Sequence, residues 1–152
     1  MNKRTRLIQQ LDRAREEMRA VLAGVDHRQE FYPGWAVKQV LAHISAWDDV
    51  TTAALRAHAR GEEPAPLDVR DIDAYNAQAV AAREALSTDQ VVAEWELARE
   101  QLKAAINGLS AEKLIEPLLY PWGGSGTVAQ IAGIMAHHEE EHVREMRELQ
   151  SR

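Results

Sequence analysis

The sequence predicts an all-α fold: a four-helix bundle with short additional helical segments. Three observations support this prediction. Apolar residues recur at three- and four-residue steps along four long stretches, which is the spacing of one face of an α-helix. Strand signals are nearly absent, because no stretch alternates regularly between apolar and polar residues. Hydrophobic residues make up 45% and charged residues 28% of the chain, a balance typical of a globular protein rather than a disordered one.

The first long helix is expected from about Arg4 to Gly24, where the glycine suits a helix end. Pro33 and Gly34 then mark a turn. The apolar residues that form one face of this helix, its apolar stripe, are Leu7, Leu11, Ala14, Met18, Val21 and Leu22.

The second helix is expected to begin near Trp35 and to fade at Ala59. Its stripe comprises Val37, Val40, Leu41, Ile44, Trp47 and Val50. The longest clear loop follows, with the sequence GEEPAPLD, and it is the natural place for a crossover connection. A modest helix is expected from Val69 to Ala85.

The third long helix begins after a capping signal, because Ser87 is followed three residues later by Gln90. It is expected to continue to Gly108. Its apolar residues are Val91, Val92, Trp95, Ala98, Leu102, Ile106 and Leu109. Residues 110–126 are expected to form a short helical turn and an irregular loop, since they contain two prolines and three glycines.

The last helix follows a second capping signal, made by Thr127 and Gln130. One face of this helix carries Val128, Ile131, Met135, His138, His142 and Met146. Two histidines therefore stand in positions where the stripe calls for an aliphatic residue.

Length and composition narrow the class of protein. At 152 residues, we expect residues 1–152 to form a single helical-bundle domain. The absence of cysteine excludes disulfides, thiolate metal sites and cysteine nucleophiles. No stretch approaches the ~18 apolar residues of a membrane helix, and the first residues lack a signal-peptide pattern, so we expect a cytoplasmic protein without a membrane partner. Lys and Arg are interspersed with Asp and Glu, and the net charge is −6. This charge pattern argues against a nucleic-acid partner.

The histidines of the last helix form a possible metal-binding pair. His138 and His142 are four residues apart and therefore lie on one helix face, about 6 Å apart along the axis. Such a pair can hold a single cation. His137 points about 100° away from them. The alternative interpretation is that both histidines are half-buried and hydrogen-bonded at the edge of the stripe.

A third histidine favours the metal-site interpretation over that of hydrogen-bonded, half-buried histidines. His43 lies on the inward side of the second helix, beside Val40 and Trp47. Burying three imidazoles is unfavourable unless each has a partner, and one cation can satisfy all three. Three protein ligands with one open position are typical of a catalytic metal. His27 and His58 lie in a turn and near a helix end, and we expect both to be solvated.

A zinc-protease interpretation is the least favoured. Residues 138–142 read HEEEH and match the pattern H-E-x-x-H, in which Glu139 would be the general base. However, only ten residues follow, none of them histidine, and no sheet is expected to present a peptide. In the bundle interpretation Glu139 lies one step off the ligand face and is expected to matter little, unless it orients a histidine.

Two segments resemble the DinB/YfiT-like superfamily. The segment GWAVKQVLAHISAWDD resembles its second helix, and GTVAQIAGIMAHHEEEHVREMREL resembles its last helix. The resemblance implies that His43, His138 and His142 bind a divalent metal, zinc or nickel. It also implies up-down-down-up connectivity and frequent dimerisation, and we expect a homodimer.

The resemblance implies an enzyme of small-molecule chemistry. Characterised relatives are metal-dependent enzymes that handle low-molecular-weight thiols, namely S-transferases of bacillithiol type and mycothiol-dependent isomerases. We therefore expect a thiol-dependent S-transferase, isomerase or hydrolase, with no residue yet singled out as catalytic. The candidates to line its substrate pocket are Trp47, Tyr75, Asn76 and Trp122. The alternative is a metal-free binding or self-protection bundle, similar to a colibactin-protection branch that lacks the three histidines.

Overall fold

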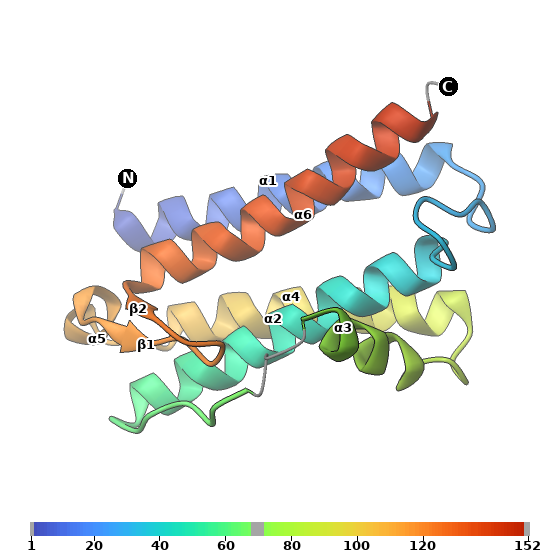
Figure 1. Ribbon diagram of the computed structural model, residues 1–152. Helices are drawn as coiled ribbons and strands as arrows, with labels where there is room; N and C mark the ends of the chain where they lie inside the picture. Colours follow the sequence, from blue (N-terminus) through green and yellow to red (C-terminus); the bar gives the residue numbers. More distant parts are fainter. Residues whose placement is uncertain (1, 68–71, 151–152) are drawn as a thin grey trace.

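The computed structural model describes residues 2–67 and 72–150, and it contains the four expected long helices (Figure 1). These are α1 (Lys3–Gly24), α2 (Val37–Ala59), α4 (Thr88–Asn107) and α6 (Val128–Gln150). The short elements are α3 (Ile72–Ala81), α5 (Ala111–Ile115), β1 (Leu118–Leu119) and β2 (Ser125–Gly126). The all-α prediction is therefore confirmed. None of the described helices combines the length and the apolar character that crossing a membrane requires.

The four long helices pack as two pairs. In Figure 1, α1 lies beside α6, and α2 lies beside α4. The members of each pair run in the same direction, and the two pairs run in opposite directions, which gives the expected up-down-down-up connectivity. Because α2 and α4 are parallel, the chain must return along the bundle between them. The segment that contains α3 makes this crossover.

The two capping signals predicted from the sequence form reciprocal hydrogen bonds at the starts of α4 and α6. The Ser87 hydroxyl accepts from the N–H of Gln90 at 3.1 Å, and the Gln90 side chain accepts from the N–H of Ser87 at 2.8 Å. Thr127 and Gln130 repeat the arrangement at 3.1 and 2.9 Å. Each pair satisfies two backbone donors that a helix start leaves without partners.

The crossover helix is shorter than predicted. The expected helix from Val69 to Ala85 begins at Ile72 and ends at Ala81, while residues 69–71 lie outside the described part of the chain. After Ala81 the backbone forms tight turns with bonds between residues three apart, so the helix does not continue.

A small hairpin replaces part of the irregular loop expected before the last helix. Leu118 pairs with Gly126 and Leu119 with Ser125 in antiparallel register. Gly123, at a φ of +100°, helps the chain to reverse between the two strands, since this region of φ is unfavourable for other residues. Strands of two residues are too short to produce an alternating pattern that a sequence could reveal.

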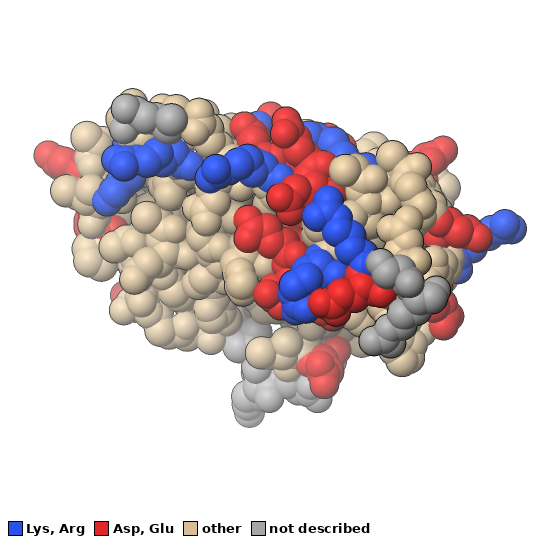
Figure 2. Space-filling model, turned by 90° about the horizontal axis from the view of Figure 1, so that it is seen from above, with Lys and Arg blue, Asp and Glu red and all other residues tan. Residues whose placement is uncertain are grey.

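Two apolar clusters fill the bundle at its two ends. One cluster gathers around Leu11, Leu102 and Ile131, and the other gathers around Met18 and Val40. Midway along the helices, between these clusters, lie buried charged residues and the histidines. On the outer face of α1 and α6, acidic and basic side chains intermingle over one half, and a row of basic side chains crosses the other half (Figure 2).

Candidate metal centre

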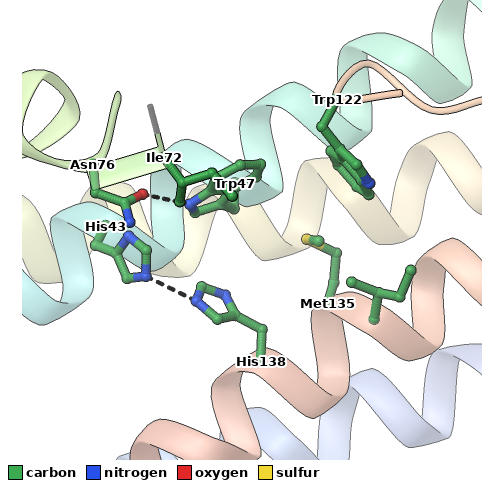
Figure 3. Close-up of a pocket in the computed structure, with 8 residues that line it drawn as sticks. His43, Trp47, Ile72, Asn76, Trp122, Met135 and His138 are labelled. Carbon is green, nitrogen blue, oxygen red and sulfur yellow. Dashed lines mark hydrogen bonds between the residues drawn. The ribbon is translucent and has the colours of Figure 1, made fainter. Parts of the chain in front are cut away.

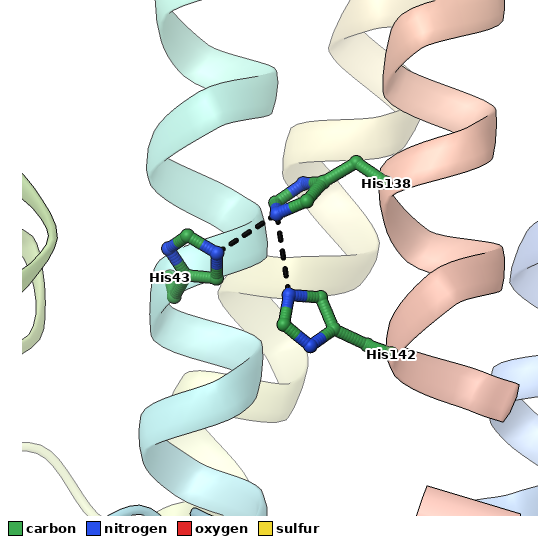
Figure 4. Close-up of side chains that lie close together, drawn as sticks. All are labelled: His43, His138 and His142. Atoms are coloured by element: carbon green, nitrogen blue, oxygen red, sulfur yellow. Dashed lines mark hydrogen bonds between the residues drawn. The ribbon is translucent and has the colours of Figure 1, made fainter. Parts of the chain in front are cut away.

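The three histidines of the predicted metal site meet between α2 and α6 (Figure 4). His43 projects from α2, and His138 and His142 project from α6. The Nε2 atom of His138 lies 2.8 Å from the Nε2 of His43 and 3.2 Å from the Nε2 of His142. One candidate ligand atom from each of the three rings falls within 4.8 Å of the others. The fold therefore brings together residues that are some ninety positions apart in the sequence.

This donor set fits a divalent cation. A neutral imidazole nitrogen carries either one hydrogen or one lone pair in the ring plane, so it serves one partner well. The Nε2 atom of His138 faces two other ring nitrogens at once, and protons alone cannot make good hydrogen bonds in both contacts. A cation would accept a lone pair from each of the three rings. Three imidazoles with a free position are the ligand set of catalytic zinc.

Burial keeps the imidazoles in the neutral form that a metal requires. Burial lowers the pKa of His43 to about 3, and the charge of His142 acts in the same direction. Burial likewise lowers the pKa of His138 to about 2, assisted by the charges of His43 and His142. The pKa of His142 is also lowered, again mainly by burial. All three rings are therefore unprotonated near neutral pH, and their lone pairs are available to a cation.

A tyrosine that the sequence did not single out contacts the outer side of this site. The hydroxyl of Tyr32, in the turn between α1 and α2, lies 2.7 Å from Nδ1 of His142. When Nε2 of His142 carries the lone pair, Nδ1 carries the hydrogen and donates it to the Tyr32 oxygen. The ring of Trp35 packs 5.2 Å from the ring of His43. The aromatic residues of this turn thus border two of the three histidines.

A cavity of about 390 Å³ opens beside His43 and His138 (Figure 3). Three of the four predicted pocket residues, Trp47, Asn76 and Trp122, line it. The Asn76 side-chain oxygen accepts from the indole N–H of Trp47 at 2.9 Å, so these two walls are joined.

The fourth predicted pocket residue, Tyr75, is not part of the cavity lining. Its ring packs edge-on against Trp47, with 4.9 Å between ring centres. Tyr75 therefore supports a wall of the cavity instead of facing its interior, because α3 turns its neighbour Asn76 towards the histidines.

The remaining histidines do not join the site. His58 is 6% exposed, and its Nε2 lies 2.8 Å from the backbone oxygen of Lys113. The expectation that His58 is solvated was wrong, because α5 supplies this acceptor beside the end of α2. His27 is exposed, as expected, and His137 faces solvent with 70% of its side chain exposed.

Four buried charges form a closed network next to the histidines: Arg15, Asp48, Arg99 and Glu139. Each long helix contributes one of them, and none of the four side chains is more than 2% exposed. Glu139 pairs with Arg15 at 2.9 Å and with Arg99 at 2.8 Å. Asp48 pairs with Arg99 at 2.9 Å and with Arg15 at 3.4 Å. The network balances two positive and two negative charges inside the bundle.

The position of Glu139 corrects the sequence-based expectation that this residue matters little. Its Oε1 accepts from Arg15 at 2.9 Å and from the indole N–H of Trp95 at 3.1 Å. Its Oε2 pairs with Arg99, and the residue is fully buried. A carboxylate engaged on both oxygens is poorly placed to act as the general base of a protease. The structure therefore gives Glu139 a role in packing the helices.

Comparison with known proteins agrees with this architecture. A sequence profile of the DinB superfamily matches residues 10–146. The chain belongs to the DinB superfamily. Within it, this chain is similar to the uncharacterized protein YuaE of Bacillus subtilis (strain 168), at 28% identity over an alignment of 127 residues that covers 78% of either chain.

The fold of this DinB-superfamily chain is also found in solved structures. Two crystal structures of mycothiol-dependent maleylpyruvate isomerase, one of them a mutant, are similar to it with a TM-score of 0.79. Sequence identity is 14% and 15%, and the similarity covers 95% of this chain. The chain spans only 61% of the length of the isomerase. At this identity the comparison establishes a shared fold.

Proposed function

We propose that this protein is a metal-dependent enzyme of the DinB type, in which His43, His138 and His142 hold a divalent cation. The observation that carries the proposal is the convergence of three neutral imidazole nitrogens on one point beside a cavity. Imidazole ligands suit zinc and nickel, and the chain has no cysteine that could provide a softer ligand. A metal-free binding bundle is less well supported, because it provides no group that could accept the lone pairs of the facing ring nitrogens.

The residues of the chain prepare this site in several ways. When bound, the cation supplies Lewis-acid chemistry that lowers the pKa of a water or thiol and so provides an anionic nucleophile near neutral pH. Burial keeps the three rings neutral. Tyr32 holds the ring of His142 in the orientation and tautomer that turn Nε2 inwards. The indoles of Trp47 and Trp122 give the cavity that adjoins the rings an apolar lining.

We propose a low-molecular-weight thiol as the second substrate. The support is the shared fold with an isomerase whose name makes it mycothiol-dependent, together with a cavity that opens at the histidines. The reaction is then an S-transfer, an isomerisation or a hydrolysis of a small molecule. In the S-transfer case the thiol sulfur forms a bond to carbon, a leaving group departs with the electron pair, and the thiol proton passes to solvent.

The experiment compares adjacent histidines of one helix. The zinc- and nickel-loaded protein is mixed with bacillithiol, mycothiol or glutathione and with 1-chloro-2,4-dinitrobenzene, and release of the thioether is followed. We expect at least one thiol to give a metal-dependent rate that His138→Ala abolishes. His137→Ala is the matched control and should keep the rate, because its ring faces solvent. Rates equal to the uncatalysed reaction with every thiol and both metals would contradict thiol transfer.

A further inference from the structure

The cavity beside the histidines is apolar and, among its described lining residues, carries no charged side chain. Its walls are formed by the indoles of Trp47 and Trp122 and by the side chains of Ile72, Ile134 and Met135 (Figure 3). The amide of Asn76 provides a polar group beside the ring of His43, and its oxygen is already engaged by Trp47 (Figure 3). The edges of two imidazoles complete the lining. A ligand in this cavity therefore meets aromatic and aliphatic surface on most sides.

Among the described residues, two arginines near this region already have acidic partners. The buried guanidinium of Arg99 is paired with both Asp48 and Glu139. Arg83, which packs near α3, is paired with Asp49 at 3.2 Å. In the metal-free protein, an anion that entered the cavity would lose its hydration without gaining a counter-charge from the described lining residues, and that transfer is strongly unfavourable.

We infer that the walls of this cavity select an uncharged, largely apolar ligand, such as a substituted aromatic ring, and by themselves disfavour carboxylates. The indoles of Trp47 and Trp122 pack edge-on against each other, with 5.6 Å between ring centres, and together they present aromatic surface on which a flat ring can pack. A volume of about 390 Å³ matches the range of small-molecule sites. The assignment of the cavity to the electrophilic substrate, the partner of the thiol, rests on the proposed function. The preference of the cavity for neutral ligands does not, because that preference arises from the walls alone.

Ile134 offers a way to change this preference without disturbing the core. It lies on α6 one turn before His138, lines the cavity and is 41% exposed. Ile72 lines the cavity from α3 and is 54% exposed. A lysine at either position would bring a positive charge to the cavity while leaving its stem at the surface. Leu97, on α4 and 56% exposed, is a similar exposed side chain that is not part of the lining.

The test uses two ligands that share one ring system, the neutral 1-naphthalenemethanol and the anionic 1-naphthoate. Their binding to metal-free protein is measured by titration calorimetry, because a bound dication would itself attract the carboxylate. We expect the alcohol to bind at least tenfold more tightly than the carboxylate. Ile134→Lys should reduce this ratio at least tenfold, and Ile72→Lys should shift it in the same direction from the opposite wall. Leu97→Lys should leave both affinities unchanged.

Each other outcome counts against the inference. Equal affinity for the two ligands in the unaltered protein, or binding of neither, would overturn the assigned selectivity. Lysine variants that retain the original ratio would show that the ligands bind elsewhere. Circular dichroism verifies that each variant is folded, and two variants on different helices keep the test decisive should one misfold. Neutral selectivity in a protein that binds no metal would refute the proposed enzyme and leave the cavity assignment intact.

Discussion

The ring of His142 is contacted at both of its nitrogens. Its Nε2 faces His138 at 3.2 Å, and its Nδ1 lies 2.7 Å from the hydroxyl of Tyr32. Burial raises the pKa of Tyr32, and the nearby carboxylate of Glu145 acts in the same direction. Tyr32 is therefore a neutral phenol that can accept the Nδ1 hydrogen of His142. One hydrogen bond from a turn thus sets which nitrogen of a candidate ligand faces the site.

Replacing Tyr32 with phenylalanine should weaken metal binding by about tenfold, because loss of a hydrogen bond to the outer nitrogen of a metal-binding histidine typically costs ~10- to 100-fold in affinity. Competition with a chromophoric zinc chelator measures the change. Tyr75→Phe is the matched control, since that ring packs on Trp47 and contacts none of the three histidines. An unchanged affinity in Tyr32→Phe would show that the hydroxyl does not orient His142.

The sequence could predict the candidate ligands but not their outer partner. His138 and His142 share a helix face because of a local four-residue spacing, and His43 falls on the inward side of its own helix. Tyr32, in contrast, reaches His142 because the turn after α1 folds back towards α6. The path of such a turn depends on long-range packing, which a local pattern does not contain.

At the scale of the helices, the buried charge network connects the two pairs. Arg15 from α1 contacts Asp48 on α2 and Glu139 on α6, and Arg99 from α4 contacts the same two carboxylates. The backbone of α6 carries His138 immediately before Glu139. The ion pairs that hold Glu139 therefore also fix the position of His138 along the bundle axis relative to α2.

Glu139→Gln should destabilise the protein by about 3–5 kcal/mol, because removing one partner of a buried ion pair leaves an uncompensated charge. Here the variant would leave two arginines to share one carboxylate. Urea unfolding measures the change. Glu140→Gln, at the next position of α6 and outside the network, is the control and should change stability by less than about 0.5 kcal/mol, as substitutions away from buried ion pairs usually do. Equal stability of the two variants would remove the structural role of Glu139.

Helical periodicity predicted the four long helices but missed this network. A pattern of apolar residues assigns charged residues to the outer face by default, and Arg15 and Asp48 stand directly beside core residues of their helices. Only the packing of four helices shows that their charges cancel. The length of α3 and the presence of the hairpin were missed for a related reason, since short elements depend on their neighbours more than on their own sequence.

At the scale of the whole molecule, up-down-down-up connectivity places the histidines where the two helix pairs face each other. His43 belongs to the α2–α4 pair, and His138 belongs to the α1–α6 pair (Figure 1). The site therefore spans the boundary between the pairs. Burying neutral histidines at this boundary makes the stability of the metal-free protein depend on pH.

Metal-free protein should lose stability as the pH falls below about 6.5. In the unfolded chain the histidines bind protons near this pH, whereas His43 and His138 in the folded protein remain unprotonated until about pH 3 and about pH 2. The unfolded state therefore binds more protons in this window, and each histidine costs up to ~1.4 kcal/mol per pH unit. Urea midpoints at pH 7.5 and 5.0 measure the effect. A His43→Gln variant with an undiminished pH dependence would contradict this assignment.

The homodimer remains a prediction, and its basis is exposed apolar surface. Five large apolar side chains are at least 41% exposed among the described residues: Ile72, Leu97, Ile115, Leu119 and Ile134. Light scattering over a tenfold range of concentration should report twice the mass of one chain. A single-chain mass at the highest concentration would contradict it.

The most direct test of the metal centre is elemental analysis of the protein purified without a polyhistidine tag. Inductively coupled plasma mass spectrometry should find about one zinc or nickel ion per chain, as three imidazole ligands predict. The His43→Ala variant should lose most of this metal, although His43 lies on a different helix pair from His138 and His142. Metal retained in His43→Ala but lost in His138→Ala would reduce the site to a two-histidine pair. The absence of a stoichiometric metal from the unaltered protein after reloading would contradict the three-histidine centre altogether.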